Sequence, residues 1–225
     1  MTFKYEKQKL RQGYDGVIGC DEVGRGCLAG PVVAAAVALP QACGFKLRAA
    51  NFGQIRDSKL LTPKKREELA EFIKENFLWS VARVSPKQID RLNIHHATLL
   101  AMRLAVEKLH TTASSQEKIL RKSAESFNRE RHDNLFLFLD GKFIIPKFNM
   151  KQEAVVGGDN KVLSVAAASI VAKVYRDELM RKYHLKYPAY DFHRHKGYAT
   201  SRHREMVKKY GLCKIHRLSF CTHLT

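Results

Sequence analysis

The chain has 225 residues, 45% of them hydrophobic, and is therefore long and apolar enough to bury a core as one domain. Its 40 Lys and Arg residues outnumber its 22 Asp and Glu residues, which gives a formal net charge of +18. This composition excludes disorder as the main state and favours a polyanionic partner. Nucleic acid is the commonest such partner, with an anionic membrane surface and plain solubility as the alternatives.

The cysteines and the N-terminal segment indicate the cellular compartment. Residues 1–16 begin with charged side chains but contain no apolar segment of the kind that a secretory signal requires. The longest apolar run, residues 32–39, is far shorter than the roughly 18 residues of a membrane span. We expect a cytoplasmic protein with no membrane association. No CxxC pair occurs, and we expect buried or free thiols at Cys20, Cys27, Cys43, Cys213 and Cys221.

In chain order, a short basic extension over residues 1–15 precedes two apolar segments. Gly16 to Cys20, and residues 31–40 with a proline at each end, both predict buried strands. Thr62 followed by Pro63 predicts the start of an amphipathic helix over residues 64–77.

The pattern continues with a strand and a long helix. Residues 78–84 predict the strand, and Ser85 with Gln88 predicts a capping box that opens a helix through Leu109. The polar, highly charged residues 111–134 then predict an insertion, which is either helical or a loop.

Three further elements complete the prediction. The apolar residues 135–139 predict a strand that ends on Asp140, and residues 153–158 predict another that ends near Asp159. A long helix follows over residues 161–184. Apolar strands alternating with helices indicate an α/β layered domain from residue 16 to residue 225.

Four acidic side chains follow the predicted strands at their ends: Asp21, Glu22, Asp140 and Asp159. Ligand sites gather at strand ends in open α/β sheets, and carboxylates that repel one another there require a cation. Hard oxygen ligands select Mg²⁺ or Mn²⁺, and such ions with carboxylates on a basic protein are typical of two-metal phosphoryl transfer on nucleic acid. The alternative for each acid taken singly is a helix cap or a surface group.

The turn Gly24-Arg25-Gly26 comes directly after the first acidic pair. Two glycines let the backbone approach a ligand, so that its N–H groups can meet sugar or phosphate oxygens, and Arg25 can reach a phosphate. The same pattern in isolation is often only a turn, but its place after Asp21 and Glu22 makes it specific.

Other titratable residues are interpreted as structural or solvated. Asp177 rivals Asp159 as a fourth carboxylate, but its position within a helix beside Arg176 favours a surface or ion-pair role. His96 shares a predicted helix side with apolar residues and is interpreted as a packed side chain. No cysteine stands at zinc-ligand spacing, so four histidines are interpreted as solvated or phosphate-facing: His193, His195, His203 and His216.

Seven blocks of the sequence together resemble the type 2 ribonucleases H, specifically the ribonuclease HII family. The resemblance covers nearly the whole chain from residue 16. The blocks are Asp21 to Gly26, Arg56 to Lys59, Leu139 to Lys142, Gly158-Asp159, Ser164 to Asp177, His195 to Thr200 and Ile215 to Phe220.

The resemblance implies a ribonuclease H-like fold, in which helices flank a central mixed sheet and a small helical C-terminal region follows. It implies an endonuclease that cuts the RNA strand of RNA·DNA hybrids and nicks duplex DNA on the 5′ side of an embedded ribonucleotide, leaving 5′-phosphate and 3′-hydroxyl ends. By the family pattern, Mg²⁺ or Mn²⁺ would be held by the catalytic set of Asp21, Glu22, Asp140 and Asp159.

The family pattern also implies roles for substrate-binding residues. Gly24, Arg25 and Gly26 would read the 2′-hydroxyl, and Tyr198 would pack on the neighbouring sugar to test for deoxyribose. Three residues are weaker candidates for phosphate contacts: Ser58, Lys59 and Lys173.

Two alternatives stay open. One is a ribonuclease HIII-like hybrid endonuclease, although that group typically carries lysine at the position of Arg25 and an added N-terminal domain. The other is a catalytically inactive hybrid-binding protein, which would gain nothing from acids that face phosphate. We expect a monomer, and the short segment after Phe220 makes recruitment by a sliding clamp through a C-terminal tail doubtful.

Overall fold

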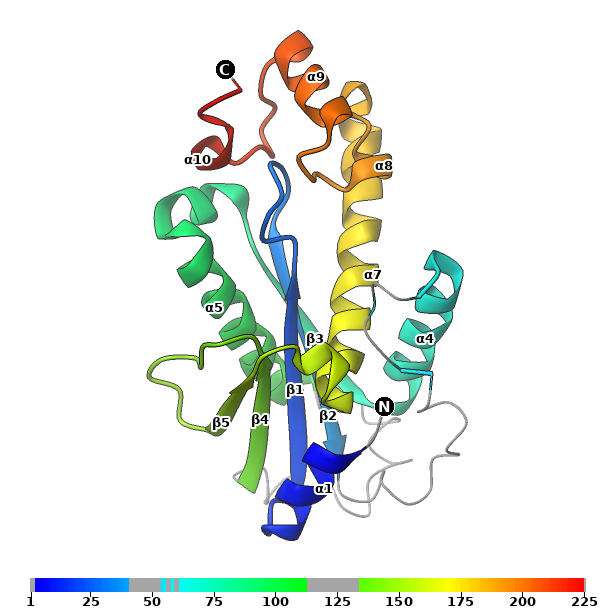
Figure 1. The fold of residues 1–225 in the computed structure, drawn as a ribbon, viewed down its shortest axis with the longest axis vertical. Coiled ribbons are helices and arrows are strands. Elements are labelled where there is room, and N and C mark those ends of the chain that lie inside the picture. The colour runs from blue at the N-terminus through cyan, green and yellow to red at the C-terminus, as the bar shows by residue number, and fades with distance from the viewer. Residues whose placement is uncertain (1–2, 41–53, 56–57, 59–60, 113–133, 225) are drawn as a thin grey trace.

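The computed structural model describes residues 3–40, 54–55, 58, 61–112 and 134–224 (Figure 1). Most of the predicted insertion at 111–134 lies outside the described residues, as do Lys59 and Cys43. None of the helices within the described ranges is sufficiently long and apolar to cross a membrane.

The centre of the fold is a five-stranded mixed sheet in the order β3-β2-β1-β4-β5. Strand β1 pairs antiparallel with β2 and parallel with β4, while β2–β3 is antiparallel and β4–β5 is parallel. The predicted mixed α/β sheet is therefore confirmed. The strands are β1 (Gly16–Val23), β2 (Val32–Pro40), β3 (Leu78–Val84), β4 (Leu135–Asp140) and β5 (Lys151–Val155).

The helices lie on both sides of this sheet (Figure 1). The α-helices are α1 (Lys4–Arg11), α4 (Pro63–Asn76), α5 (Pro86–Thr112), α7 (Leu163–Lys186), α8 (Phe192–His195), α9 (Ser201–Tyr210) and α10 (Leu218–Cys221). The described residues also include the short 3₁₀ helices η3 (Gly158–Asn160) and η4 (Pro188–Tyr190).

Alternation along the strands creates two apolar cores. On β1, Val17 faces the core shared with α4 and α7, whereas Ile18 and Cys20 face the core shared with α5. Helix α7 packs closely on β1, because a Cβ built at Gly19 would lie 2.0 Å from the backbone carbon of Ser164. This contact holds α7 directly against the strand that ends in the acidic pair.

The basic extension contributes a helix to this arrangement. The ring of Tyr5 in α1 meets Phe138 edge-on, and Lys9 Nζ lies 2.9 Å from Glu153 in β5. Glu6 is fully buried, and its Oε1 accepts a hydrogen bond from the backbone N–H of Ser164 at 2.9 Å. A carboxylate at this place satisfies a free N–H in the first turn of α7 and suits the helix dipole.

The predicted helix starts are confirmed by their caps. Thr62 Oγ1 accepts from the N–H of Lys65 at 3.3 Å, and Ser85 and Gln88 make the reciprocal bonds of a capping box. The strand predicted at 153–158 begins and ends earlier, at Lys151 and Val155. It ends because Gly157 adopts a left-handed conformation that leads into η3.

The interpretation of His96 as a packed side chain is wrong. Asn93 within α5 has φ 60° and ψ 167°, so the helix is broken there. The break changes the phase between the residues before and after Asn93, and His96 is exposed. The spacing to Ile89 and Leu92 therefore carried no information about the side on which His96 lies.

The C-terminal region forms a third, smaller core, with Phe192 and Tyr190 at its centre. His195, His203 and His216 are buried in it, so their interpretation as solvated or phosphate-facing residues is wrong. Aromatic and apolar neighbours surround all three rings. His203 Nε2 lies 3.0 Å from His216 Nε2, and burial lowers the pKa of both histidines to about 4, which keeps them neutral.

Candidate active site

The carboxyl ends of β1 and β4 bring two acids side by side. The strands are parallel neighbours with Cys20 opposite Leu139, so the next residues, Asp21 and Asp140, lie at the same level. Both side chains lie on the face of the sheet that α7 covers. Side chains alternate along a strand, and Phe138, two residues before Asp140, belongs to the core on that face. The sheet thus joins residues that are far apart in the sequence.

Glu22 completes a cluster of three carboxylates. One oxygen from each of Asp21, Glu22 and Asp140 lies within 4.8 Å of the other two. Asp140 Oδ1 accepts the N–H of Gly158 at 2.7 Å, and Glu22 Oε1 accepts from Arg25 Nη1 at 3.3 Å. The buried Oε2 of Glu22 accepts no hydrogen bond from any residue that the structure describes.

Burial and mutual repulsion oppose the ionisation of these acids. Burial raises the pKa of Asp21 well above its usual range, and the charges of Glu22 and Asp140 raise it further. Burial also raises the pKa of Glu22, against the lowering effect of the Arg25 guanidinium. The charged forms are costly without a counterion, so a cation bound among them would favour their ionisation.

The donor set fits a divalent ion such as Mg²⁺ or Mn²⁺. All three donors are hard carboxylate oxygens, and within the described ranges no histidine or cysteine joins the cluster. Among the described residues, the buried Oε2 of Glu22 has no hydrogen-bond donor, which suits a metal ligand.

Asp159, the fourth predicted ligand, lies beside this cluster rather than in it. It belongs to η3, is 5% exposed, and accepts a hydrogen bond from Asn160 Nδ2 at 3.1 Å. Among the described residues, Asp159 belongs to no group of three acids in which one oxygen from each lies within 4.8 Å of the others. Its role as a metal ligand stays a prediction.

The turn after β1 has the conformation that its glycines permit. Gly24 has φ +91°, and a Cβ there would lie 2.2 Å from Nε of Arg176, so only glycine fits. A Cβ at Gly26 would meet nothing within 4 Å, which leaves room for a ligand against the backbone. The side chain of Arg25 is 48% exposed and is accessible to a ligand.

A buried arginine from the C-terminal region holds this turn in place. Arg217 Nη2 donates to the carbonyl of Gly24 at 2.6 Å, Nη1 to that of Arg25 at 2.7 Å, and Nε to that of Gly30 at 2.9 Å. Arg217 is fully buried, and burial lowers its pKa to about 10, at which it stays charged near neutral pH. Three carbonyls thus share one guanidinium, which fixes the path of the turn.

Arg176 of α7 acts in the same way on the adjoining segment. Its Nη1 donates to the carbonyl of Lys196 at 2.9 Å, and its other two nitrogens donate to Pro31 and Ala29 at 3.2 Å each. It is also fully buried. The two arginines therefore connect the Gly-Arg-Gly turn with the segment that carries Tyr198.

Tyr198 lies beside the turn, although 172 to 174 residues separate it from Gly24 to Gly26 in the sequence. It forms an antiparallel bridge with Cys27, and the N–H of Leu28 donates to Gly197 at 2.9 Å. Tyr198 is 40% exposed, and the guanidinium of Arg176 lies 5.8 Å from the centroid of its ring. An accessible ring on a fixed backbone is suited to stacking against a ligand.

The three weaker phosphate candidates differ in their surroundings. Ser58 is buried and shares a 3.1 Å hydrogen bond with Ser169, whose side chain lowers the pKa of Asp21 against the effect of burial. Lys173 is half-buried and pairs with Asp177 at 2.8 Å, which confirms the ion pair predicted for Asp177. Lys59 lies outside the described residues.

Three residues that position the site were given no role from the sequence: Ser169, Arg176 and Arg217. The sequence pattern could have indicated that Arg176 is buried. It is a charged residue among apolar residues that recur every four positions in α7 and are buried: Ala168, Ala172 and Met180. No comparable pattern marks Arg217, whose partners lie about 190 residues earlier.

Comparison with known proteins gives a consistent result. The family model described as Ribonuclease HII matches residues 18–223. Ribonuclease HII of Caldicellulosiruptor bescii is 43% identical over 219 residues, covering 97% of this chain and 92% of the relative. Ribonuclease HII of Syntrophobacter fumaroxidans is 46% identical over 217 residues, covering 96% and 81%.

A solved structure shares the fold. The ribonuclease HII of the Archaeoglobus fulgidus complex with PCNA is similar with a TM-score of 0.61 and 29% identity, covering 92% of this chain and 96% of that one. Together with the acids at the ends of β1 and β4, these matches show that the chain belongs to the ribonuclease HII family, whose members are type 2 ribonuclease H enzymes that cut RNA·DNA hybrids.

Proposed function

We propose that this chain also nicks duplex DNA on the 5′ side of a single embedded ribonucleotide, leaving a 5′-phosphate and a 3′-hydroxyl. One observation carries the proposal: the bridge between Cys27 and Tyr198 sets an accessible aromatic ring beside the Gly-Arg-Gly turn. A site with both the ring and the turn can contact two adjacent sugars and distinguish ribose from deoxyribose at each. Cutting a uniform hybrid requires recognition of only one kind of sugar in the cleaved strand.

The metal site belongs to the same proposal. Asp21, Glu22 and Asp140 would hold Mg²⁺ or Mn²⁺, with Asp159 as a further ligand from η3. Such ions supply the Lewis acid that phosphodiester hydrolysis needs at neutral pH. The protein's own part is to support the acids: Gly158 donates to Asp140, and the Ser169 side chain opposes the rise in the pKa of Asp21.

The Gly24 to Gly26 turn would recognise the ribose. The 2′-hydroxyl distinguishes RNA from DNA at a single nucleotide, and it both donates and accepts hydrogen bonds. Gly26 leaves the backbone open to a sugar, and Arg25 beside Glu22 can reach the adjoining phosphate. Because Arg217 fixes the turn before substrate arrives, little ordering is needed on binding.

Tyr198 would test the next sugar. A flat ring packs well on a deoxyribose but meets an added hydroxyl less well, so a DNA residue following the ribonucleotide would be favoured. Lys173, 5.9 Å from the same ring, is placed to meet a phosphate nearby if it leaves Asp177. Specificity for the junction would then arise from the Gly-Arg-Gly turn and Tyr198 together.

The competing proposal is a ribonuclease HIII-like preference for long hybrids. Arg25, where that group typically carries lysine, argues against it. Arg25 is also ion-paired with Glu22 at 3.3 Å. The fork of a guanidinium can bond a carboxylate and a phosphate together more readily than an ammonium can.

Cleavage of an end-labelled DNA duplex with one ribonucleotide tests the proposal, using Mg²⁺, Mn²⁺ or EDTA. An RNA·DNA hybrid and an all-DNA duplex serve as controls. We expect a metal-dependent nick 5′ to the ribonucleotide and no cutting of all-DNA. Cutting of the long hybrid alone would overturn the single-ribonucleotide proposal and favour the HIII-like preference.

A further inference from the structure

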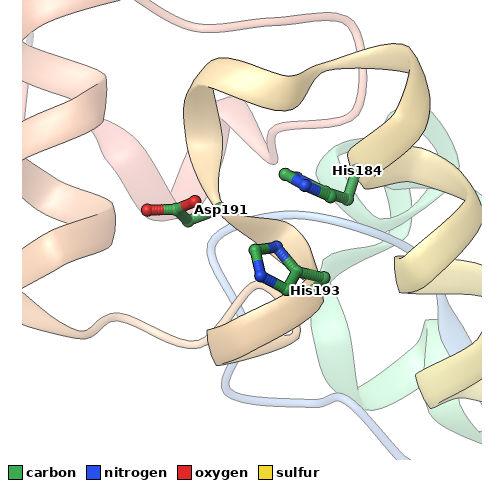
Figure 2. Close-up of side chains that lie close together, drawn as sticks. All are labelled: His184, Asp191 and His193. Carbon is green, nitrogen blue, oxygen red and sulfur yellow. The ribbon is translucent and has the colours of Figure 1, made fainter.

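A second group of metal-binding side chains lies away from the acidic cluster, where α7 ends. His184 is in the last turn of α7, and His193 belongs to the short helix α8. Asp191 lies between them in the sequence and has a left-handed backbone with φ 57°. The chain reverses direction over these residues, which brings the three side chains together (Figure 2).

The ligand atoms of this group are close. One nitrogen from His184, one from His193 and one oxygen from Asp191 all lie within 4.8 Å of one another. The ring centroids of the two histidines are 4.0 Å apart. Two ligands of one zinc ion are each about 2.0 to 2.2 Å from it, so side-chain rotations would have to bring these atoms closer to close the site.

Two further features prepare these residues for a ligand. The Nδ1 atom of His184 is buried, and no atom in the described part of the chain bonds it. Arg202 Nε donates to Asp191 Oδ2 at 3.0 Å, which fixes the carboxylate and leaves Oδ1 available. A carboxylate held from behind in this way is typical of an oriented metal ligand.

The chemistry of the donors selects the ion. Two imidazoles and one carboxylate suit Zn²⁺, whereas Mg²⁺ and Ca²⁺ require several oxygens. The neighbouring charges of Arg194, Lys196 and Arg202 also disfavour an ion that is held mainly by charge. Zn²⁺ gains much of its binding energy from the nitrogen ligands and is less affected.

We propose that His184, Asp191 and His193 form a zinc site that is separate from the carboxylate cluster and keeps a coordination position open for water. Zinc there would join the end of α7 to the turn that precedes α8. That turn leads through Lys196, whose carbonyl Arg176 holds, to Tyr198. The ion would therefore stiffen the segment that carries the exposed ring.

Competition with a chromophoric chelator tests the proposal, with Zn²⁺ alone as the titrated probe. The protein carries Asp140→Asn, and millimolar Mg²⁺ is present, so that Zn²⁺ binding at the carboxylate cluster does not contribute to the titration. We expect one Zn²⁺ per chain, and at least about a tenfold loss of affinity in each of His184→Ala, Asp191→Asn and His193→Ala. His96→Ala, an exposed histidine outside the group, is the matched control and should bind as before.

Two measurements distinguish loss of the zinc site from misfolding of a variant. Circular dichroism without metal checks that each variant is folded, and Asp191→Asn keeps the oxygen that accepts from Arg202. Co²⁺ in place of Zn²⁺ reports the coordination directly, since a four-coordinate site gives intense visible absorption. Zinc binding that is absent from the parent protein, or that survives His184→Ala and His193→Ala unchanged, would overturn the proposal.

Discussion

Among single residues, Asp140 accepts the N–H of Gly158 and is proposed to hold the metal. We expect Asp140→Asn to abolish cleavage and leave hybrid binding largely intact, because the amide keeps the bond from Gly158 but loses the charge that a metal needs. In EDTA the same change should raise the free energy of unfolding by on the order of 1 kcal/mol, since it removes a charge that repels Asp21. Urea unfolding and filter binding measure the two effects.

The control for this prediction is Glu107→Gln, an exposed acid on α5 that should leave cleavage and unfolding unchanged. Equal loss of binding and cleavage in Asp140→Asn would mean that the residue holds the fold or the substrate rather than the metal.

In the proposed function, Tyr198 is the residue that would discriminate between substrates. Tyr198→Ala removes the exposed ring but leaves the backbone bridge to Cys27, so we expect cleavage at a single ribonucleotide to fall more than cleavage of a long hybrid. Tyr198→Phe keeps the ring and should retain the preference. The ratio of kcat/KM on the two substrates measures the effect, and a uniform loss in Tyr198→Ala would exclude a sensing role.

At the scale of elements, Arg217 joins the segment before α10 to the turn after β1. Arg217→Lys leaves at most part of the hydrogen bonding to Gly24, Arg25 and Gly30 in place, since one ammonium does not match three carbonyls. We expect a loss of about 2 to 4 kcal/mol in unfolding free energy and a lower kcat/KM. Arg204→Lys, on the exposed side of α9, is the matched control and should change neither value.

The packing of α9 against the C-terminal segment gives a pH dependence. His203 and His216 have pKa values of about 4 in the folded protein, below the usual value of 6.5. The unfolded chain thus binds more protons, so this contribution to stability is complete above pH 6.5 and is lost as the pH falls towards 4. Unfolding near pH 5 should take up about two protons from this pair, measured from urea midpoints against pH.

A variant separates this pair from other acid-sensitive groups. His216→Phe removes one of the two titrating rings but keeps an aromatic side chain in the small core, so the pH slope should fall by about one proton. An unchanged slope would show that the acid sensitivity comes from other residues.

For the whole molecule, we expect the net charge of +18 to dominate association with nucleic acid. Phosphate contacts release counterions, so we expect hybrid binding by Asp140→Asn to weaken at least about tenfold between 50 and 200 mM salt. Fluorescence anisotropy at several salt concentrations measures the slope. A flat dependence would mean that base or sugar contacts, rather than phosphate contacts, supply most of the affinity.

Local features of the sequence predicted much of the fold. The caps at Thr62 and Ser85 start their helices where the pattern placed them, because capping depends on residues three positions apart. The prediction failed where one residue changed the phase of a helix, as Asn93 does in α5. It also failed for His195, His203 and His216, because their burial depends on partners from separate elements.

The sequence by itself determined the chemical character of this protein: a basic α/β domain, acids at strand ends, and a glycine-arginine-glycine turn. These follow from residue type and short-range order, which the chain carries locally. Only the tertiary structure decided that Asp21 and Asp140 stand level, that Arg217 holds the turn, and that Tyr198 lies beside it. Strand register and loop contacts between distant segments depend on packing of the whole chain, which no local pattern specifies.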